Sequence, residues 1–221
     1  MVNNWLIEAI GFLAQGLFSA RMLVQWVLSE KRRKVVSPAI FWILSLIASM
    51  LNVVYGWLHQ DFAIMLGQVI GYYVYIWNLW AKGIWQRAGR IGSRAAVITF
   101  ILLPVVSLTM VLVTKGSEVT ESLFKNKDIP LALLIFGTTG TLIFSLRFLY
   151  QFIYSSRRGE SILPKGFWII SLTGAMIVLP YVVIRSCLGP KVLLAQILAQ
   201  VLGLITYSRN LMIWNKTHSK G

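Results

Sequence analysis

The chain has 221 residues, of which 57% are hydrophobic and only 13% are charged. Soluble globular domains average about 25% charged residues, so this composition excludes an ordinary soluble protein and predicts one that lies in a membrane. The formal net charge is +14, but the basic residues flank hydrophobic stretches as they do in membrane proteins, so no nucleic-acid partner is expected.

Seven apolar stretches follow one another along the chain, each close to the roughly 20 residues that a membrane-spanning helix needs. They lie near Trp5–Leu28, Ala39–Leu58, Phe62–Trp80, Ala95–Val113, Leu131–Tyr154, Gly166–Ile184 and Val192–Trp214. The fourth stretch is almost free of polar residues and separates two more polar sets of three, so we interpret it as a linker helix. The predicted domains are a three-helix unit at 1–81, a linker at 82–130 and a second three-helix unit with a cytoplasmic tail at 131–221.

The distribution of lysine and arginine predicts how the chain is oriented. Fourteen of these residues fall in segments that would be cytoplasmic if the N-terminus were outside, and five fall on the opposite side. Basic residues are retained on the cytoplasmic side, so we predict an N-out, C-in topology. A removable signal peptide is not expected at the first stretch, because no basic residue precedes it and Glu8 and Gln15 interrupt it.

An internal duplication relates the first three predicted helices to the last three. A shift of 126 residues aligns Arg21 and Gln25 with Arg147 and Gln151, and it also aligns the Pro38–Trp42 segment with Pro164–Trp168. After a six-residue insertion the shift becomes 132, and Gln68, Tyr75 and Asn78 match Gln200, Tyr207 and Asn210. Ordered matches among such different residue types indicate a true repeat. Joined by a single linker helix, the repeats would lie parallel in a 3+1+3 plan, an arrangement found in SWEET transporters.

Each repeat places one arginine inside a predicted span, Arg21 or Arg147. Burying a charge there costs at least about 2.5 to 3.5 kcal/mol, so these residues require an explanation. One explanation is structural: a long arginine side chain snorkels to the headgroups or ties helix ends together. The other is that the arginine binds a ligand together with Gln25 or Gln151, which lies one turn further along the same helix face.

Further polar and aromatic groups are expected at the depth of these arginines. Gln68, Tyr75 and Asn78 project over one side of the third helix, and Trp42 and Trp168 lie one turn after a proline, either as interfacial belt residues or as part of a site. A guanidinium suits a phosphate oxygen, amides and phenols suit hydroxyls, and an indole suits a sugar face or an acyl chain. The set therefore favours a phosphorylated glycolipid or a lipid-linked sugar as ligand. The basic loops at 31–34 and 157–158 either attract anionic phospholipid or only determine topology.

Catalytic, metal and cofactor sites are not expected. The single cysteine, Cys187, excludes an intramolecular disulfide framework, and the two histidines, His59 and His218, lie far apart in the sequence, so no metal centre is expected. No nucleophile with a matching base, Gly-rich phosphate loop or carboxylate pair is present. Glu8 could relay protons in a transporter, but a lone glutamate near a helix start is more often interfacial.

The strings R-x-L-x-Q, P-x-x-F-W-x-x-S-L and Q-x-x-G-x-x-x-Y-x-R-N-L occur in this order around the basic turns. Together they resemble the lipid A biosynthesis N-terminal domain family, whose fold is similar to that of PQ-loop and SWEET transporters. The resemblance adds Arg209 to the predicted site, while Trp77 departs from the pattern in the first copy. The full predicted binding set is Arg21, Gln25, Trp42, Gln68, Tyr75, Asn78, Arg147, Gln151, Trp168, Gln200, Tyr207, Arg209 and Asn210.

The resemblance implies a multi-pass protein of the bacterial inner membrane in lipid A or lipopolysaccharide assembly. It would bind and present or translocate a phosphorylated glycolipid or lipid-linked sugar, alongside a separate glycosyltransferase. It does not imply the activity of lipid-A-disaccharide synthase, because no glycosyltransferase domain is expected in this length. Two alternatives remain: a SWEET-like transporter of a small soluble solute, and a synthase-associated membrane domain with no transport role.

Overall fold

The computed structural model describes residues 4–59, 62–87, 130–188 and 194–219, together with single positions between 102 and 113. Within these ranges the chain is helical, with no β-strand. The helices are α1 (Asn4–Arg32), α2 (Ala39–His59), α3 (Phe62–Ala81), α4 (Ile84–Arg87), α6 (Leu131–Arg158), α7 (Lys165–Leu188) and α8 (Leu194–His218). Six of the seven predicted spans coincide with long helices, and the fourth, Ala95–Val113, lies almost wholly outside the described residues.

Three of the described helices are long and apolar enough to cross a membrane. They are the segments Trp5–Arg32, Ala39–Leu58 and Lys165–Leu188. Large hydrophobic side chains also remain outside the core, such as Leu142 on α6, Met176 on α7 and Leu198 on α8, each about 60% exposed. An apolar surface of this kind is stable only against another apolar phase, so the helices have the character of a membrane protein.

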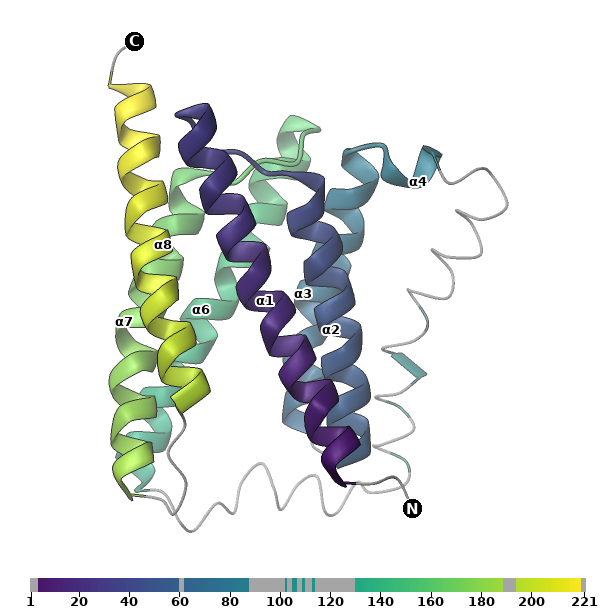
Figure 1. Ribbon diagram of the computed structural model, residues 1–221, viewed down its shortest axis with the longest axis vertical. Helices are drawn as coiled ribbons and strands as arrows, with labels where there is room; N and C mark the ends of the chain where they lie inside the picture. Colours follow the sequence, from purple (N-terminus) through teal and green to yellow (C-terminus); the bar gives the residue numbers. More distant parts are fainter. Residues whose placement is uncertain are drawn as a thin grey trace. The chain divides into compact units, whose positions relative to one another are not determined.

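The chain forms two compact units, and α1 contributes to both. The first unit combines α1 up to Arg21 with α2, α3, α4 and the short segment Gly159–Ser161. In it α2 packs against α3, and α4 follows α3 closely (Figure 1). The Tyr55 ring on α2 lies against Gly11 of α1, where a Cβ atom would come within 2.8 Å of the ring.

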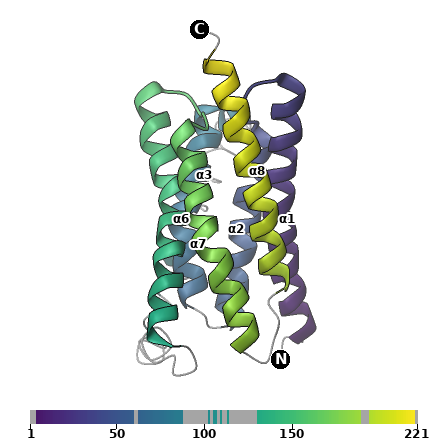
Figure 2. The same ribbon diagram turned by 90° about the vertical axis from the view of Figure 1, so that its left-hand side faces the viewer.

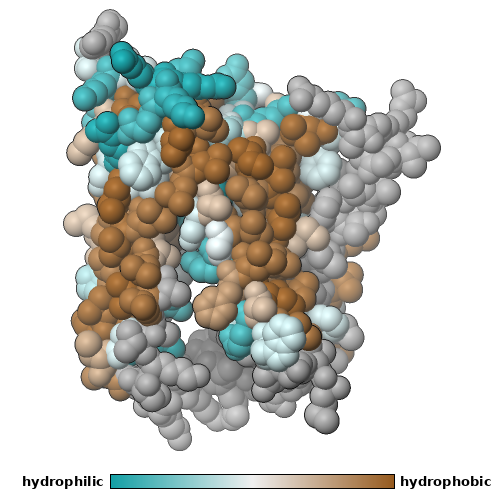
Figure 3. Space-filling view, viewed as in Figure 1, coloured by the Kyte–Doolittle hydropathy of each residue, from teal (hydrophilic) through white to brown (hydrophobic). Residues whose placement is uncertain are grey.

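The second unit combines Met22–Pro38 with α6, α7 and α8. Here α7 packs against both α6 and α8 and lies between them (Figure 2). The packing of α6 on α7 depends on Gly174, because a Cβ atom there would lie 2.8 Å from the Cα of Phe144. Hydrophilic side chains gather where α1 and α8 end (Figure 3), and Lys31, Arg32, Arg33, Lys34 and Lys216 are exposed there.

Both long first helices end in the same way. The residue after α1 is Arg33, with a φ of 52°, and the residue after α6 is Gly159, with a φ of 67°. A left-handed residue directly after the last turn is a common way to terminate a helix. Since these positions are 126 residues apart, the two copies share this terminus as well as their sequence motifs.

Candidate functional site: two buried arginine clusters

The first cluster is centred on Arg21 of α1, whose side chain is only 5% exposed. Its Nη1 atom donates hydrogen bonds to Ser45 Oγ on α2 at 2.8 Å and to Tyr75 OH on α3 at 3.2 Å. The guanidinium also lies 4.5 Å from the ring centre of Phe18 and 5.3 Å from that of Phe41. The guanidinium is thus surrounded by hydroxyl groups and aromatic rings, which stabilise a cation without forming an ion pair with it.

The second cluster repeats this arrangement around Arg147 of α6, which is 6% exposed. Arg147 Nη1 donates to Tyr207 OH on α8 at 3.0 Å. The guanidinium lies 3.5 Å from the ring centre of Phe144 and 4.6 Å from that of Phe148. An arginine keeps its charge at any accessible pH, so each unit holds a permanent buried cation.

A glycine one turn earlier allows each tyrosine to reach its arginine. The Tyr75 ring folds back along α3 over Gly71, where a Cβ atom would meet Tyr75 OH at 2.9 Å. On α8 the Tyr207 ring lies over Gly203, where a Cβ atom would meet the ring at 3.0 Å. The spacing G-x-x-x-Y is therefore explained by close packing within one helix face.

Trp42 and Trp168 lie in the cores of their units rather than at the surface. Both side chains are fully buried. Each indole lies perpendicular to the preceding phenylalanine and tilted by 39° against the tyrosine of the cluster, with ring centres 6.0 Å apart for Trp42 and 6.3 Å apart for Trp168. These indoles form the wall behind the Arg–Tyr pair, and Trp168 Nε1 has no hydrogen-bond partner in the described part of the chain.

Gln25 and Gln151 fasten the turns that follow α1 and α6. Gln25 Nε2 donates to Ser29 Oγ at 2.9 Å and to the Val36 carbonyl at 3.2 Å. Gln151 Nε2 makes the equivalent bonds to Ser155 Oγ and to the Ile162 carbonyl, both at 2.9 Å. The serines were not among the predicted site residues, although the shift of 126 residues aligns Ser29 with Ser155.

The asparagines join these turns to the third helices. Asn210 and Gln25 exchange two amide hydrogen bonds, at 2.8 and 3.0 Å. In the other unit Ser161 Oγ donates to Asn78 Oδ1 at 2.6 Å. Each asparagine also donates to a carbonyl one turn earlier on its own helix. Gln68 and Gln200 are partly exposed, and no contact recorded among the described residues connects them to an arginine cluster.

Lys82, just after α3, lies beside the same Ser161 segment. Its Nζ atom is 3.4 Å from the Ser161 carbonyl, to which it donates. Burial lowers the pKa of Lys82 below its ordinary value, because the charged ammonium loses hydration there.

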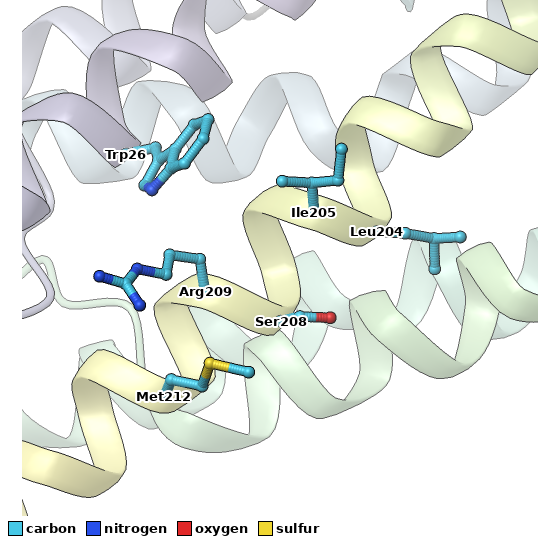
Figure 4. A pocket seen from close by; sticks show the side chains of 6 residues that line it. All are labelled: Trp26, Leu204, Ile205, Ser208, Arg209 and Met212. Carbon is cyan, nitrogen blue, oxygen red and sulfur yellow. The ribbon is translucent and has the colours of Figure 1, made fainter.

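Arg209 differs from the other predicted arginines because it is 45% exposed. Its guanidinium forms an ion pair with Glu30 near the end of α1. The same arginine borders an open groove of about 410 Å³ (Figure 4), lined by Trp26, Leu204, Ile205, Ser208, Arg209 and Met212. The structure thus places most of the predicted residues in two buried arginine clusters and at the two turns held by Gln and Asn amides. Gln68 and Gln200 lie apart from these groups, and Arg209 is an accessible cation.

The two clusters and the membrane-like helices define a duplicated helical membrane module in which each copy buries one arginine. The chain matches the family model described as the Lipid A Biosynthesis N-terminal domain at residues 10–80 and again at 136–212, and it belongs to this family. The two matched segments are the two copies of the repeat.

Several relatives carry the description lipid-A-disaccharide synthase. The proteins from Chlamydia pneumoniae, Chlamydia felis and Chlamydia trachomatis serovar D are 32%, 28% and 27% identical to the chain, over 80%, 78% and 81% of its length. The matched region is only 28% to 30% of each relative, so the chain spans less than a third of the proteins it resembles. No solved structure matches the chain significantly.

Proposed function

We propose that the chain is a multi-pass protein of the bacterial inner membrane that binds a phosphorylated glycolipid or lipid-linked sugar for lipid A or lipopolysaccharide assembly. It presents or translocates this lipid near the cytoplasmic leaflet, in concert with a separate glycosyltransferase. The proposed topology has seven spans in a 3+1+3 plan, N-out and C-in. The family membership supports the pathway, and the distribution of basic residues supports the orientation.

The observation that carries this proposal is the pair of equivalent, buried guanidiniums at Arg21 and Arg147. A cation in an apolar setting attracts a phosphate more strongly than the same cation does in water, because a low dielectric strengthens charge–charge attraction. Each arginine now donates to a neutral tyrosine hydroxyl. A phosphate oxygen is a stronger acceptor than a neutral hydroxyl, so the ligand replaces the tyrosine on the guanidinium and the tyrosine then donates to the ligand.

The remaining predicted residues take supporting roles in this scheme. Trp42 and Trp168 form the back wall against which each tyrosine moves. Gln25, Gln151, Asn78 and Asn210 hold the basic turns beside the clusters, and those turns attract anionic headgroups. Gln68 and Gln200, further from the basic ends, offer amides to sugar hydroxyls, and Arg209 adds a cation at the surface.

The test is the double variant Arg21→Ala/Arg147→Ala, purified in mild detergent and examined by native mass spectrometry for bound phosphorylated glycolipid. A hydrogen bond to a charged group contributes about 1.5–3 kcal/mol, so retention should fall by about tenfold or more. The matched control is Arg185→Ala, which removes an exposed guanidinium near the end of α7, away from the clusters and the basic turns.

Retention that is unchanged in the Arg21/Arg147 variant, or reduced equally in the control, would contradict the proposal. The Arg21→Lys/Arg147→Lys variant keeps the charge and serves as the folded reference if the alanine variant is unstable. It should retain the lipid less well than the wild type, because lysine lacks the planar fork that fits phosphate. If free neutral sugars compete for the site and glycolipids do not, the protein is instead a transporter of small solutes.

A further inference from the structure

The groove beside Arg209 is lined mostly by apolar side chains, and the Arg209 guanidinium is its charged group. Leu204, Ile205 and Met212 of α8 and the Trp26 indole of α1 form much of its lining. Figure 4 shows Trp26 reaching from α1 toward the α8 residues, with the Arg209 guanidinium near the indole. An apolar groove with a cation beside it is suited to one acyl chain of an amphiphile whose head is anionic.

Glu30 fixes the guanidinium in this position. Its carboxylate accepts from Arg209 Nε and, at 3.2 Å, from Arg209 Nη2, and it also accepts from Trp26 Nε1 at 3.1 Å. One carboxylate therefore holds both the cation and the aromatic wall of the groove. Arginine has five N–H donors, and the bonds to Glu30 use the Nε–Nη2 edge, so the Nη1 edge can still bind a second anion.

The groove combines α1 of the first copy with α8 of the second, and the equivalent positions on the other two helices carry different residues. The positions equivalent to Glu30, Trp26 and Arg209 are Ser156, Phe152 and Trp77. These residues cannot form a carboxylate–guanidinium pair. The charged groove is therefore not required by the repeated fold, and the lack of an equivalent carboxylate–guanidinium pair points to a separate role.

The charge around the groove selects an anion. The exposed residues Lys31, Arg32, Arg33 and Lys34 follow Glu30 directly, and Lys216 lies two turns after Arg209 on α8. Glu30 is the only acidic residue among these groups. Clusters of basic residues at a membrane surface attract anionic lipids by about 1 kcal/mol per residue.

We propose that this groove binds an anionic glycerophospholipid, with one acyl chain along Ile205, Met212 and Trp26 and the phosphate on the Nη1 edge of Arg209. A volume of about 410 Å³ suits one chain rather than the several chains of a lipid A precursor. The bound lipid joins α1 to α8 at their polar ends. This site is separate from the buried arginine clusters and does not depend on the function proposed for them.

The test compares phosphatidylglycerol with phosphatidylcholine of the same chain length, added to the purified full chain and measured by native mass spectrometry. The wild type should retain phosphatidylglycerol about tenfold better, and Arg209→Ala should remove this preference. Met212→Trp fills the groove without changing the charge and should reduce the binding of both lipids. Arg185→Ala, the matched control, removes an exposed guanidinium near the end of α7, outside both the groove and the basic turn, and should keep the preference.

Three outcomes would overturn the site: a full preference in Arg209→Ala, unchanged binding in Met212→Trp, or an equal loss in Arg185→Ala. If Arg209→Ala fails to fold, Arg209→Lys keeps the charge and should show an intermediate preference that weakens as salt is added. A phosphorylated glycolipid could also compete for the groove. If it displaces phosphatidylglycerol from the wild type but not from Met212→Trp, the groove binds the glycolipid, and a glycerophospholipid is not its occupant. The Arg21→Ala/Arg147→Ala variant should keep the phosphatidylglycerol preference, which distinguishes this site from the buried clusters.

Discussion

Two small residues, Gly71 and Gly203, determine whether each tyrosine can meet its arginine. An alanine Cβ at position 71 would lie 2.9 Å from Tyr75 OH, whereas at position 203 it would lie 3.0 Å from the Tyr207 ring and 3.3 Å from its hydroxyl. We therefore expect Gly71→Ala to break the Arg21–Tyr75 bond, and the loss of about 1 kcal/mol, the net value of one hydrogen bond, offsets the gain of similar size that alanine brings to a helix. The free energy of unfolding should therefore change little in Gly71→Ala, whereas Gly203→Ala should lose less and remain partly stabilising. Thermal unfolding in detergent measures both changes.

Gly16 provides the control for this prediction. It lies on α1 with nothing within 4 Å of an added Cβ atom. Because alanine favours a helix over glycine by about 1 kcal/mol, Gly16→Ala should stabilise the protein. A stabilising effect of Gly71→Ala similar to that of Gly16→Ala would show that the tyrosine does not need the space.

At the scale of single residues, the sequence predicts which groups recur but not all of their contacts. The shared depth of Arg21 and Tyr75 follows from helix periodicity and agrees with their hydrogen bond. The amide exchange between Gln25 and Asn210 could not be predicted, because the two residues are 185 positions apart and belong to different copies of the repeat. The full burial of Trp42 also depends on tertiary packing, since an aromatic residue near a helix start is equally typical of a membrane interface.

The ends of α1 and α6 differ in how well the local residue suits the backbone. Arg33 adopts a left-handed φ of 52°, while Gly159 occupies the equivalent position with a φ of 67°. A side chain in this conformation costs about 1–2 kcal/mol, which glycine avoids. We expect Arg33→Gly to raise the free energy of unfolding by about 1 kcal/mol, with the gain measured as a higher unfolding temperature in detergent.

Arg33→Gly also removes a positive charge, and a second variant separates this effect from the change in the backbone. Arg33→Ala removes the same guanidinium but leaves a Cβ atom in the left-handed position, so it should give little or no gain. An equal gain from alanine and glycine would assign the effect to reduced repulsion within the basic turn rather than to the backbone.

Helix ends are harder to predict from the sequence than helix positions. Hydropathy places the first span at Trp5–Leu28, but α1 continues to Arg32. The polar last turn of α1 contains Glu30 and Lys31, which lower the hydropathy without interrupting the backbone hydrogen bonds. The linker helix predicted at Ala95–Val113 falls mostly outside the described residues and stays a prediction.

For the molecule as a whole, the unequal distribution of basic residues predicts a topology, and a cysteine of the chain can be labelled to test it. Its one cysteine, Cys187, is exposed near the end of α7. In the proposed N-out, C-in arrangement this end of α7 lies outside, while the end of α8 lies in the cytoplasm. We expect a membrane-impermeant maleimide to label Cys187 in intact spheroplasts.

The complementary variant Cys187→Ala/Ser219→Cys moves the thiol just beyond α8, where Ser219 N donates to the Asn215 carbonyl. This thiol should remain unlabelled until the spheroplasts are permeabilised. If Ser219→Cys is labelled in intact spheroplasts and Cys187 of the wild type is not, the topology is the reverse of the one proposed. The basic ends of α1 and α8 then lie outside. The buried arginine clusters would then lie toward the wrong leaflet for a cytoplasmic glycosyltransferase, because Arg21 and Arg147 lie in the halves of α1 and α6 that lead to the basic ends.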